Sequence, residues 1–482
     1  YVVLNNSGVF QNNPVGSTSS TSTYNLSPQY NFYQSSHTSA TDNQPYSQSI
    51  IEKSPLSRVL EQGAAGTAWQ PGTGHTVTME YDVNSTTDAV RYYEIGESIP
   101  VYDGNYLTAD LTKSIVQDEE GNQVIQFTDK FGNTILKRVE TGDVITPWAE
   151  TYYVYDVYGD LRVVLPPEAT NAISANNLTA VPPGYTLVTE DHTITTANYT
   201  GGSYMYVEGA SITIDPGVTI NPETEIVPYG LSQAFLDQWA FQYKYDGRGR
   251  MVEKRGPGAG WVYMVYDKLD RLVLTQDANQ RTSNQWTFTK YDAFSRPVLT
   301  GHYTSSSSRE ALQSQLNGHS VLYETIGTTV LGYTNNAFPS VSNANDYLTA
   351  TYYDSYNNLP AGFGLTYVQE LGHGANFANL KGQVVASQTK ILNSSTWLKS
   401  AMYYDDRYRV IQTQATNLLG GTDRTTTTYD FAGKVLQTQT THSDGTASTI
   451  MAETYAYDHA GRLLEITHQI DSEAPIVLQK NE

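Results

Sequence analysis

The chain has 482 residues, of which 39% are hydrophobic and 16% charged, and its formal net charge is −21. A surface this acidic repels phosphate backbones, so we expect no nucleic-acid partner. The sequence has no cysteine, which excludes disulfides and thiolate-based metal, iron–sulfur or nucleophilic sites. Its 38 tyrosines, together with many threonines, serines, asparagines and glycines, favour strands joined by polar turns and predict an all-β protein.

The chain starts with a polar segment, residues 1–50, that has few aliphatic clusters. We interpret it as a loop-rich wrap over a neighbouring surface. Ordered structure is expected over residues 51–182, where apolar and polar residues begin to alternate at residues 76–81. No apolar run reaches the roughly 20 residues of a membrane-spanning helix, so we expect no membrane span. Because residue 1 is tyrosine and residues 477–482 still resemble a strand, we interpret the chain as part of a longer polypeptide.

A hairpin pattern follows between residues 111 and 139. Three alternating segments are separated by short runs of turn-forming residues. The segments are residues 114–117, 124–128 and 134–137. Gly132 and Asn133 in the second turn are residue types that adopt the positive φ of tight hairpins. The pattern therefore predicts three consecutive antiparallel strands.

A tyrosine–aspartate pair then recurs, followed at near-constant spacing by a turn residue and usually an arginine. Seven copies are clear: Tyr155 and Asp156; Tyr245, Asp246 and Arg250; Tyr266, Asp267 and Arg271; Tyr291, Asp292 and Arg296; Tyr404, Asp405 and Arg409; Tyr429 and Asp430; Tyr457, Asp458 and Arg462. An eighth pair, Tyr353 and Asp354, is degenerate because Asn357 and Asn358 replace the turn residue and the arginine. So many copies at one spacing indicate a repeated structural unit.

The residue types explain what one copy does. The aspartate accepts hydrogen bonds from backbone NH groups in the turn, a Gly, Asn or Asp adopts the left-handed conformation, and the basic residue opens the return strand. Each copy is thus predicted to be one hairpin. A single hairpin cannot bury its apolar face, so the copies must stack edge to edge, with ladders of tyrosines across neighbouring strands. The expected fold is a long antiparallel sheet of stacked hairpins.

Three segments interrupt this rhythm. Residues 183–228 alternate strictly and are predicted to form an inserted small β unit. Residues 308–318 begin with Ser308 at a helix N-cap position and end in Asn-Gly, which predicts one short helix, and residues 231–239 are a candidate for a second. The tyrosine–aspartate repeats continue over residues 229–482.

These repeats resemble the Rhs/YD-repeat family, and most closely its Bacteroidota-type branch. The resemblance covers roughly residues 50–482 and includes three further motifs. They are Ser54-Pro55-Leu56 through Glu61-Gln62-Gly63, residues 152–156 continuing into Leu165-Pro166-Pro167-Glu168-Ala169, and residues 256–263.

The resemblance implies that the sheet spirals into a hollow shell. Residues 51–182 would be the first part of it, and residues 229–482 would continue beyond the end of this chain. In relatives such a shell encloses a C-terminal toxin or displays adhesive domains, and export by a type IX route is implied. The Asp-Pro-containing self-cleaving motif that precedes many such toxins is missing here, and no toxin-like segment occurs before Glu482.

The repeated aspartates are also candidates for paired acids in glycoside hydrolysis, which requires two carboxyl groups at a defined separation. A catalytic pair is a singular site, whereas one aspartate per turn is typical of a structural role. The run from Gly256 to Gly260 lacks the Gly-Lys-Ser/Thr ending of a phosphate loop, and the nine histidines show no His-Glu-x-x-His spacing. We therefore predict no catalytic residue, cofactor or metal, and the repeat tyrosines are expected to pack in the sheet more often than to stack on sugars.

These observations favour a non-enzymatic shell scaffold of a large bacterial protein, secreted or on the cell surface, that serves adhesion, motility or display. Expected partners are other parts of the same polypeptide, secretion-machinery or cell-surface proteins, and glycans. A cocoon that encloses and delivers a C-terminal toxin is the alternative. An enzyme, such as a glycan hydrolase, is the third hypothesis.

Overall fold

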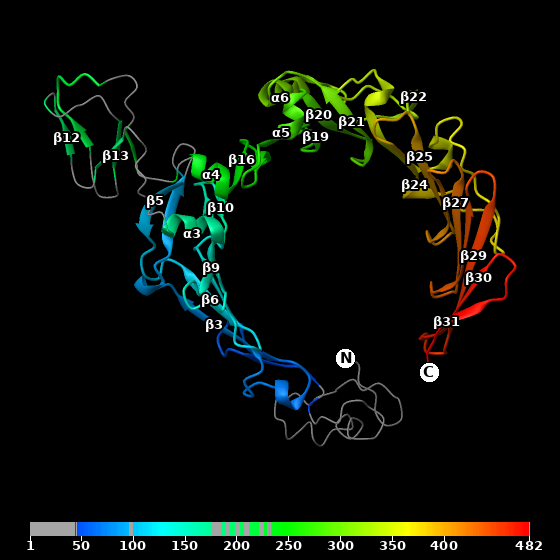
Figure 1. Ribbon diagram of the computed structural model, residues 1–482, viewed down its shortest axis with the longest axis horizontal. Helices are drawn as coiled ribbons and strands as arrows, with labels where there is room; N and C mark the ends of the chain where they lie inside the picture. The colour runs from blue at the N-terminus through cyan, green and yellow to red at the C-terminus, as the bar shows by residue number, and fades with distance from the viewer. Residues whose placement is uncertain are drawn as a thin grey trace. The chain divides into compact units, whose positions relative to one another are not determined.

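In the computed structural model, whose helices and strands are labelled in Figure 1, the chain forms two compact units. The first comprises residues 1–245 and 254–259, and the second residues 246–253 and 260–482. The structure describes residues 44, 46–95, 100–175, 185–188, 192–195, 197, 203–206, 212–220, 226–228, 231 and 233–481. The wrap predicted for residues 1–50 lies almost entirely outside these ranges. The division into an insertion and two flanking parts stays a prediction.

The first unit is built on an antiparallel sheet in which neighbours in sequence are mostly neighbours in space. Its strands pair in the order β1 (Gln48–Ile51), β2 (Val59–Gly63), β3 (Val77–Val83), β6 (Thr112–Gln117), β7 (Gln123–Thr128), β8 (Thr134–Glu140), β9 (Trp148–Tyr155), β10 (Leu161–Leu165) and β16 (Phe241–Tyr245). A separate antiparallel pair consists of β4 (Arg91–Ile95) and β5 (Pro100–Asn105). The hairpins predicted between residues 111 and 139 are confirmed as β6, β7 and β8.

Helices and short 3-10 turns complete this unit. They are η1 (Thr67–Trp69), η2 (Thr86–Asp88), α3 (Pro167–Ala175) and α4 (Gln233–Trp239). The core lies where α3 and α4 meet the sheet, and its largest fully buried side chains include Phe127, Leu136 and Tyr152. Alternation along β7 and β9 places these residues on one face, which is why they share a core.

In the segment predicted as a small β unit, the strands that the structure describes are short and pair in parallel. One sheet joins β11 (Tyr185–Val188), β13 (Ser203–Tyr206) and β15 (Ile226–Pro228), and another joins β12 (His192–Ile194) and β14 (Ile212–Ile214). Ile194 and Tyr204 are buried between them. Alternation predicts strands but not their direction, because antiparallel and parallel strands share the same two-residue period.

The second unit carries most of the repeats. Strand β17 (Met251–Arg255) contains one of the positions at which the two units divide. Strand β22 (Ile326–Val330) belongs to the second unit but is not part of its large sheet. Consecutive antiparallel pairing runs through β18 (Val262–Tyr266), β19 (Leu272–Gln276), β20 (Gln285–Tyr291), β21 (Pro297–Thr304), β23 (Tyr347–Asp354), β24 (Leu380–Lys390), β25 (Trp397–Tyr404), β26 (Val410–Thr416), β27 (Thr422–Tyr429), β28 (Val435–Ser443), β29 (Ser448–Tyr457), β30 (Leu463–Ile470) and β31 (Ile476–Lys480). The prediction of an all-β fold made of stacked antiparallel hairpins is confirmed.

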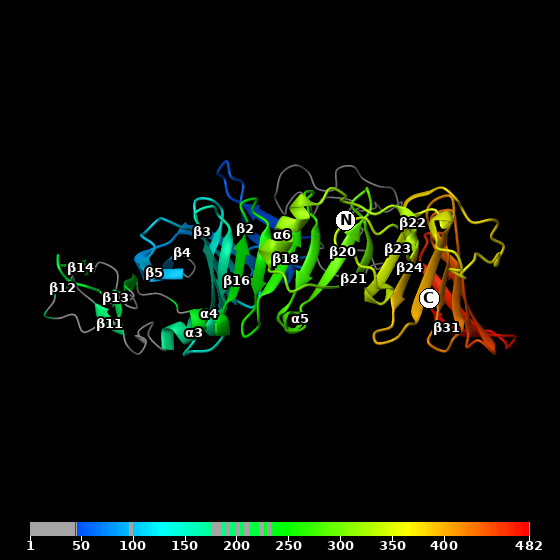
Figure 2. The same cartoon turned by 90° about the horizontal axis from the view of Figure 1, so that it is seen from above.

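Helices α5 (Ala278–Thr282) and α6 (Arg309–Gly318), and the 3-10 turns η3 (Ala344–Asp346) and η4 (Tyr356–Asn358), lie in the connections of this unit. Helix α6 packs beside β18 (Figure 2). Its Gln313 amide accepts from the backbone NH of Tyr266 (3.0 Å) and donates to the carbonyl of the same residue (2.6 Å), as a paired strand would. The helix predicted at residues 308–318 and its Ser308 cap are confirmed.

The core of the second unit lies between the sheet and its long connections, with Trp286, Phe288, Tyr347 and Tyr352 fully buried. Helices α3 and α5 were not expected from the sequence. Helix α5 has an Asp277 N-cap that closes a capping box with Gln280, which is a readable signal, but the helix is only five residues long. Such a turn is too short for helical periodicity to show.

Candidate functional site

The repeated turn is the most distinctive constellation in the structure, and the aspartate closes it. In the Asp267 copy, one carboxylate oxygen accepts the backbone NH groups of Leu269 (2.9 Å) and Arg271 (3.0 Å). The same two bonds, to the second and fourth residues after the aspartate, are made by Asp156, Asp246, Asp292, Asp405 and Asp458. Asp430 makes the second of them, to Lys434 (2.8 Å).

The third residue after the aspartate adopts positive φ. Glycine fills this position in several copies, for example Gly249 (φ 72°), as expected from its lack of a Cβ. Asp270 (φ 60°), Ser295 (φ 63°) and Tyr408 (φ 61°) also adopt this conformation. The sequence did not indicate this for Ser295 or Tyr408, because residues other than glycine, asparagine and aspartate seldom have positive φ. The aspartate's hydrogen bonds therefore fix the turn even where the residue type opposes it.

The register of the strands changes beside the signature tyrosine in six copies. Tyr266 pairs with Leu272, six residues later, whereas Val265 pairs with Leu274, so that Val273 is the extra residue on the return strand. The same six-residue pairing occurs at Tyr155, Tyr291, Tyr404, Tyr429 and Tyr457. A bulge places one extra residue on one strand of a pair. In the Tyr266 copy the bulge follows the arginine: Arg271 itself stands opposite Asp267, whose backbone NH donates to the Arg271 carbonyl (3.0 Å).

The arginine links one repeat to the next. Arg271 donates through Nε to its own Asp267 (2.7 Å), donates through Nη1 to the carbonyl of Asp292 (3.4 Å) and lies 4.7 Å from the ring centre of Tyr291. Arg250 lies over Tyr266 (5.1 Å), Arg296 over Tyr353 (4.2 Å), Arg409 over Tyr429 (4.8 Å) and Lys434 over Tyr457 (5.3 Å). We name this arrangement the repeat clasp: the aspartate of one copy, its basic residue, and the tyrosine of the next copy.

Five signature tyrosines add a further bond between repeats. Their hydroxyl groups donate to a backbone carbonyl of the neighbouring repeat. The pairs are Tyr266 to Met251 (2.7 Å), Tyr291 to Leu272 (2.7 Å), Tyr353 to Pro297 (3.1 Å), Tyr404 to Val384 (2.6 Å) and Tyr429 to Val410 (2.8 Å). Neighbouring repeats are therefore linked at these tyrosines by two kinds of contact, a basic side chain over the ring and a hydroxyl bond to a backbone carbonyl.

These contacts leave the repeat carboxylates with little capacity for chemistry. Both oxygens of Asp246, Asp267, Asp292, Asp405 and Asp458 are hydrogen-bonded, one to the turn and the other to the arginine. The backbone NH and the guanidinium of Arg462 hold the pKa of Asp458 at about 2. A carboxyl group held ionised in this way cannot act as a general acid near neutral pH.

A buried ion pair in the second unit was not apparent from the sequence. Lys290 and Glu324 are both fully buried, with 2.8 Å between Nζ and Oε1. Lys290 also donates to Asn335 (2.6 Å), while Glu324 accepts from Thr334 and from the backbone NH groups of Asn336 and Ala337. Burial lowers the pKa of Lys290. The pair ties the connection after α6 to β20.

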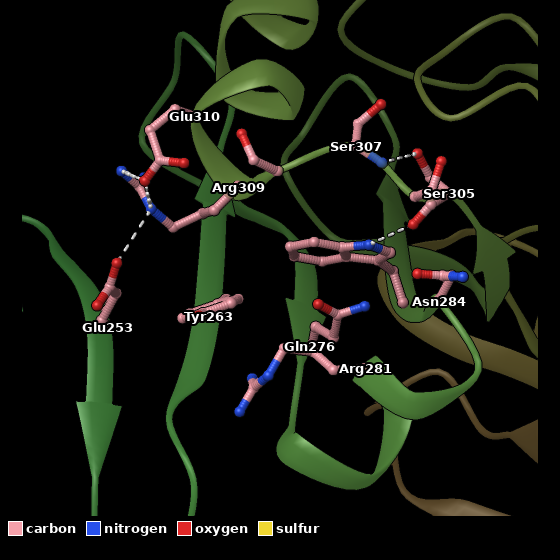
Figure 3. Close-up of a pocket in the computed structure, with 12 residues that line it drawn as sticks. Glu253, Tyr263, Gln276, Arg281, Asn284, Ser305, Ser307, Arg309 and Glu310 are labelled. Carbon is pink, nitrogen blue, oxygen red and sulfur yellow. Dashed lines mark hydrogen bonds and ion pairs between the residues drawn. The ribbon is translucent and has the colours of Figure 1, made fainter.

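Two pockets contain polar and aromatic side chains. The smaller, of about 260 Å³, lies in the second unit beside the start of α6 (Figure 3). Its Arg309 lies between Glu310 (3.0 Å) and Glu253 (3.7 Å), and Trp286 donates to the carbonyl of Ser305 (3.3 Å). Arg309, Glu310 and Glu253 thus pair with one another, while Arg281 lies over the ring of Tyr263 (4.5 Å). The larger pocket, of about 650 Å³, lies in the first unit and is lined by tyrosines of β4 and β9.

Within the described ranges, no three His, Asp or Glu side chains are gathered as metal ligands would be. In the same ranges, none of the helices has both the length and the apolar character to cross a bilayer.

Comparison with known proteins gives limited matches. Residues 9–83 match a family described as a domain of unknown function, DUF6443. No curated protein matches the chain. Among solved structures the chain is similar to a TcdB2-TccC3-TEV crystal structure, with 11% identity and a TM-score of 0.34 over 90% of this chain and 19% of that one.

Two further solved structures are similar at the same level. One is TcdB2-TccC3 without its hypervariable C-terminal region, at 12% identity and a TM-score of 0.32, over 88% of this chain and 18% of that one. The other is the Photorhabdus luminescens Tc holotoxin pore, at 12% identity and a TM-score of 0.24, over 89% and 26%. The chain thus spans about a fifth of the length of the first of these proteins.

Proposed function

We propose that this chain is a non-catalytic wall of an Rhs/YD-repeat scaffold, part of a longer bacterial polypeptide that is secreted or held at the cell surface. There it would support adhesion, motility or display. The observation that carries this proposal is the repeat clasp. The same Asp, Arg and Tyr contacts recur from copy to copy and use the groups that a reaction would require.

The contacts between successive copies are those expected of a structural repeat. In the copies at Arg250, Arg271 and Arg409, the guanidinium bonds the aspartate of its own turn and the backbone of the next turn. Adding a copy therefore creates the acceptor for one more clasp, as nearest-neighbour stabilisation in repeat proteins requires. A single reactive centre would instead place distinct residues at one copy.

The first experiment determines where the protein is located in the cell. Antibodies against this region should label intact cells, and external protease should remove the label without lysis. A pool confined to the cytosol, with no label on intact cells or in the medium, would contradict the proposal. A second experiment determines the sequence that follows residue 482 in the intact polypeptide. An adhesive or export domain there would support display, whereas a variable toxin domain would favour a cocoon that encloses a toxin and would replace this proposal.

A direct test of the non-catalytic role uses Asp267→Asn and Asp405→Asn. Each should lower the thermal unfolding midpoint by a comparable amount, because each removes the same clasp. Glycan hydrolysis that is lost in one variant while the midpoint stays unchanged would show an active site in place of a structural repeat.

A further inference from the structure

The larger pocket lies where the first unit departs from the repeat pattern. Its volume is about 650 Å³, and its walls come from β4, β9, the turn at Asp129 and the turn at Asp156. Aromatic side chains dominate the lining. They are Tyr92, Tyr93, Tyr106, Phe131, Tyr152, Tyr153, Tyr155 and Tyr158. Phe131 and Tyr158 stand at the tips of the two turns and are 78% and 89% exposed.

The turn at Asp129 is a copy of the repeat turn without its arginine. Asp129 accepts the NH groups of Phe131 (2.8 Å) and Asn133 (2.9 Å), and Thr128 pairs with Thr134, six residues later. The position of the arginine is occupied by Asn133, whose amide donates to the second Asp129 oxygen (3.0 Å). This amide makes the same hydrogen bond that the arginine Nε makes to the second aspartate oxygen in the other copies. An asparagine is too short to continue toward the next tyrosine, as an arginine does.

The tyrosine that such an arginine would cover is Tyr155. Asn133 and Tyr155 both line the pocket. Within the described part of the chain, the hydroxyl groups of Tyr106, Tyr153 and Tyr155 form no hydrogen bond with the protein, whereas the hydroxyls of five other signature tyrosines do. Tyr404 also lacks a covering arginine, but it is buried and its hydroxyl is bonded. Tyr155 therefore keeps an open face and a free hydroxyl.

The charges around this face favour a cation. Four carboxylates line the pocket, from Glu94, Asp110, Asp129 and Asp156, against two cationic side chains, Arg91 and Lys130. Burial raises the pKa of Tyr155 and of Tyr106, and the nearby negative charge of Asp129 adds to both shifts. Asp129, Tyr106 and Tyr155 are therefore close enough to interact.

We propose that this pocket binds an arginine side chain carried by a peptide of another polypeptide chain. The guanidinium takes the place of the missing clasp arginine. It stacks on Tyr155 and donates to the Asp129 carboxylate and to the carbonyl of Asp156, the equivalents of the groups that Arg271 contacts at Tyr291, Asp267 and Asp292. The volume beyond the guanidinium holds the flanking peptide between Phe131 and Tyr158.

The probe is the peptide acetyl-Gly-Gly-Arg-Gly-Gly-amide, titrated by calorimetry into the full chain. Its counterpart carries citrulline, which keeps the planar shape and length but has no charge. The arginine peptide should bind at least about tenfold more tightly, which corresponds to about 1.4 kcal/mol. Equal binding of the two peptides would overturn the proposal. So would a pocket that takes neutral oligosaccharides and neither peptide, because sugars also stack on tyrosine.

The matched variant is Asn133→Arg, which supplies the missing clasp residue from the chain itself. It should reduce binding of the arginine peptide at least about tenfold, because an internal guanidinium occupies the site. The control is Asn122→Arg, in the equivalent position of the Asp118 turn, away from the pocket, and it should bind as the parent does. Unchanged binding by Asn133→Arg would contradict the proposal.

A second pair of variants tests the same pocket independently, in case Asn133→Arg fails to fold. Phe131→Ala and Tyr158→Ala remove exposed rings at the pocket mouth, and each should weaken the arginine peptide several-fold. Phe294→Ala is their control, because Phe294 has the same place in the Asp292 turn and is 79% exposed. Loss of binding in all three variants, or in none, would contradict a site at this pocket.

Discussion

At the residue scale, the aspartate of each turn could be predicted and the arginine only in part. The aspartate bonds within its own turn, so local spacing contains the information. Arg271 instead contacts Asp292 and Tyr291 of the next copy, and its position depends on strand register. The Lys290–Glu324 pair could not be predicted from the sequence, because it joins residues 34 positions apart through a connection with no periodic signal.

Arg271 provides the sharpest test of the clasp. Its side chain is 8% exposed and that of Asp267 is 3% exposed, so removing the guanidinium leaves a buried carboxylate without its partner. Arg271→Ala should lower the free energy of unfolding by about 3 kcal/mol, and Arg271→Lys should restore only part of it. Arg462→Ala is the matched control, because that side chain is 80% exposed and should matter little. Urea denaturation measures both, and equal effects would contradict the account.

Arg296 of the clasp has a second carboxylate partner, Asp354, and this pair predicts how stability depends on pH. The guanidinium of Arg296 lowers the pKa of Asp354 below its usual value. A depressed folded-state pKa contributes stability above the unfolded value, about 3.9, and that contribution is lost as pH falls through the folded value. The thermal midpoint of the parent should therefore drop more steeply below about pH 4 than that of Asp354→Asn. Parallel curves for the two proteins would show that the pair does not stabilise the fold.

At the element scale, the hairpins between residues 111 and 139 and helix α6 follow from their sequence patterns, while other elements do not. Alternation and turn residues specify β6, β7 and β8, and Ser308 marks the start of α6 by accepting the NH of Ala311 (3.2 Å). The bulge beside Tyr266 and Tyr291 is not visible in the sequence of a single hairpin, because it depends on which residues face each other across the strands. The parallel pairing of β11 with β13 and of β13 with β15 is hidden because parallel and antiparallel strands share the same two-residue alternation.

Strand β21 contains Gly301, at a position where a larger side chain would clash with its neighbours. A Cβ on Gly301 would lie 2.3 Å from the carbonyl oxygen of Asp346 and 2.6 Å from the Phe288 ring. Gly301→Ala should therefore push β21 away from its neighbours and cost about 2 kcal/mol of unfolding free energy. Gly318→Ala, at the end of α6, meets nothing within 4 Å and is the control. Circular dichroism during urea denaturation distinguishes them, and a neutral Gly301→Ala would contradict the packing described for β21.

At the scale of the whole molecule, composition and repeat count predicted the all-β class correctly, since strand-forming residues and turn signatures extend over most of the chain. The division at residues 245 and 260 could not be predicted, because the signature spacing continues across it. The arginine site proposed at Tyr155 rests on Asn133, which stands in the place of an arginine. The sequence contained this signal, but its meaning required the geometry of the other copies.

The central claim is that the repeated aspartates are equivalent parts of one wall. The measurement that tests it most directly is the free energy of unfolding of Asp267→Asn, Asp292→Asn and Asp405→Asn, each made singly in the same chain. The account predicts that all three are destabilised by about 2 to 4 kcal/mol, because each leaves a partly buried arginine without its carboxylate. A single aspartate whose replacement leaves the unfolding free energy unchanged and abolishes an activity of the chain would contradict it.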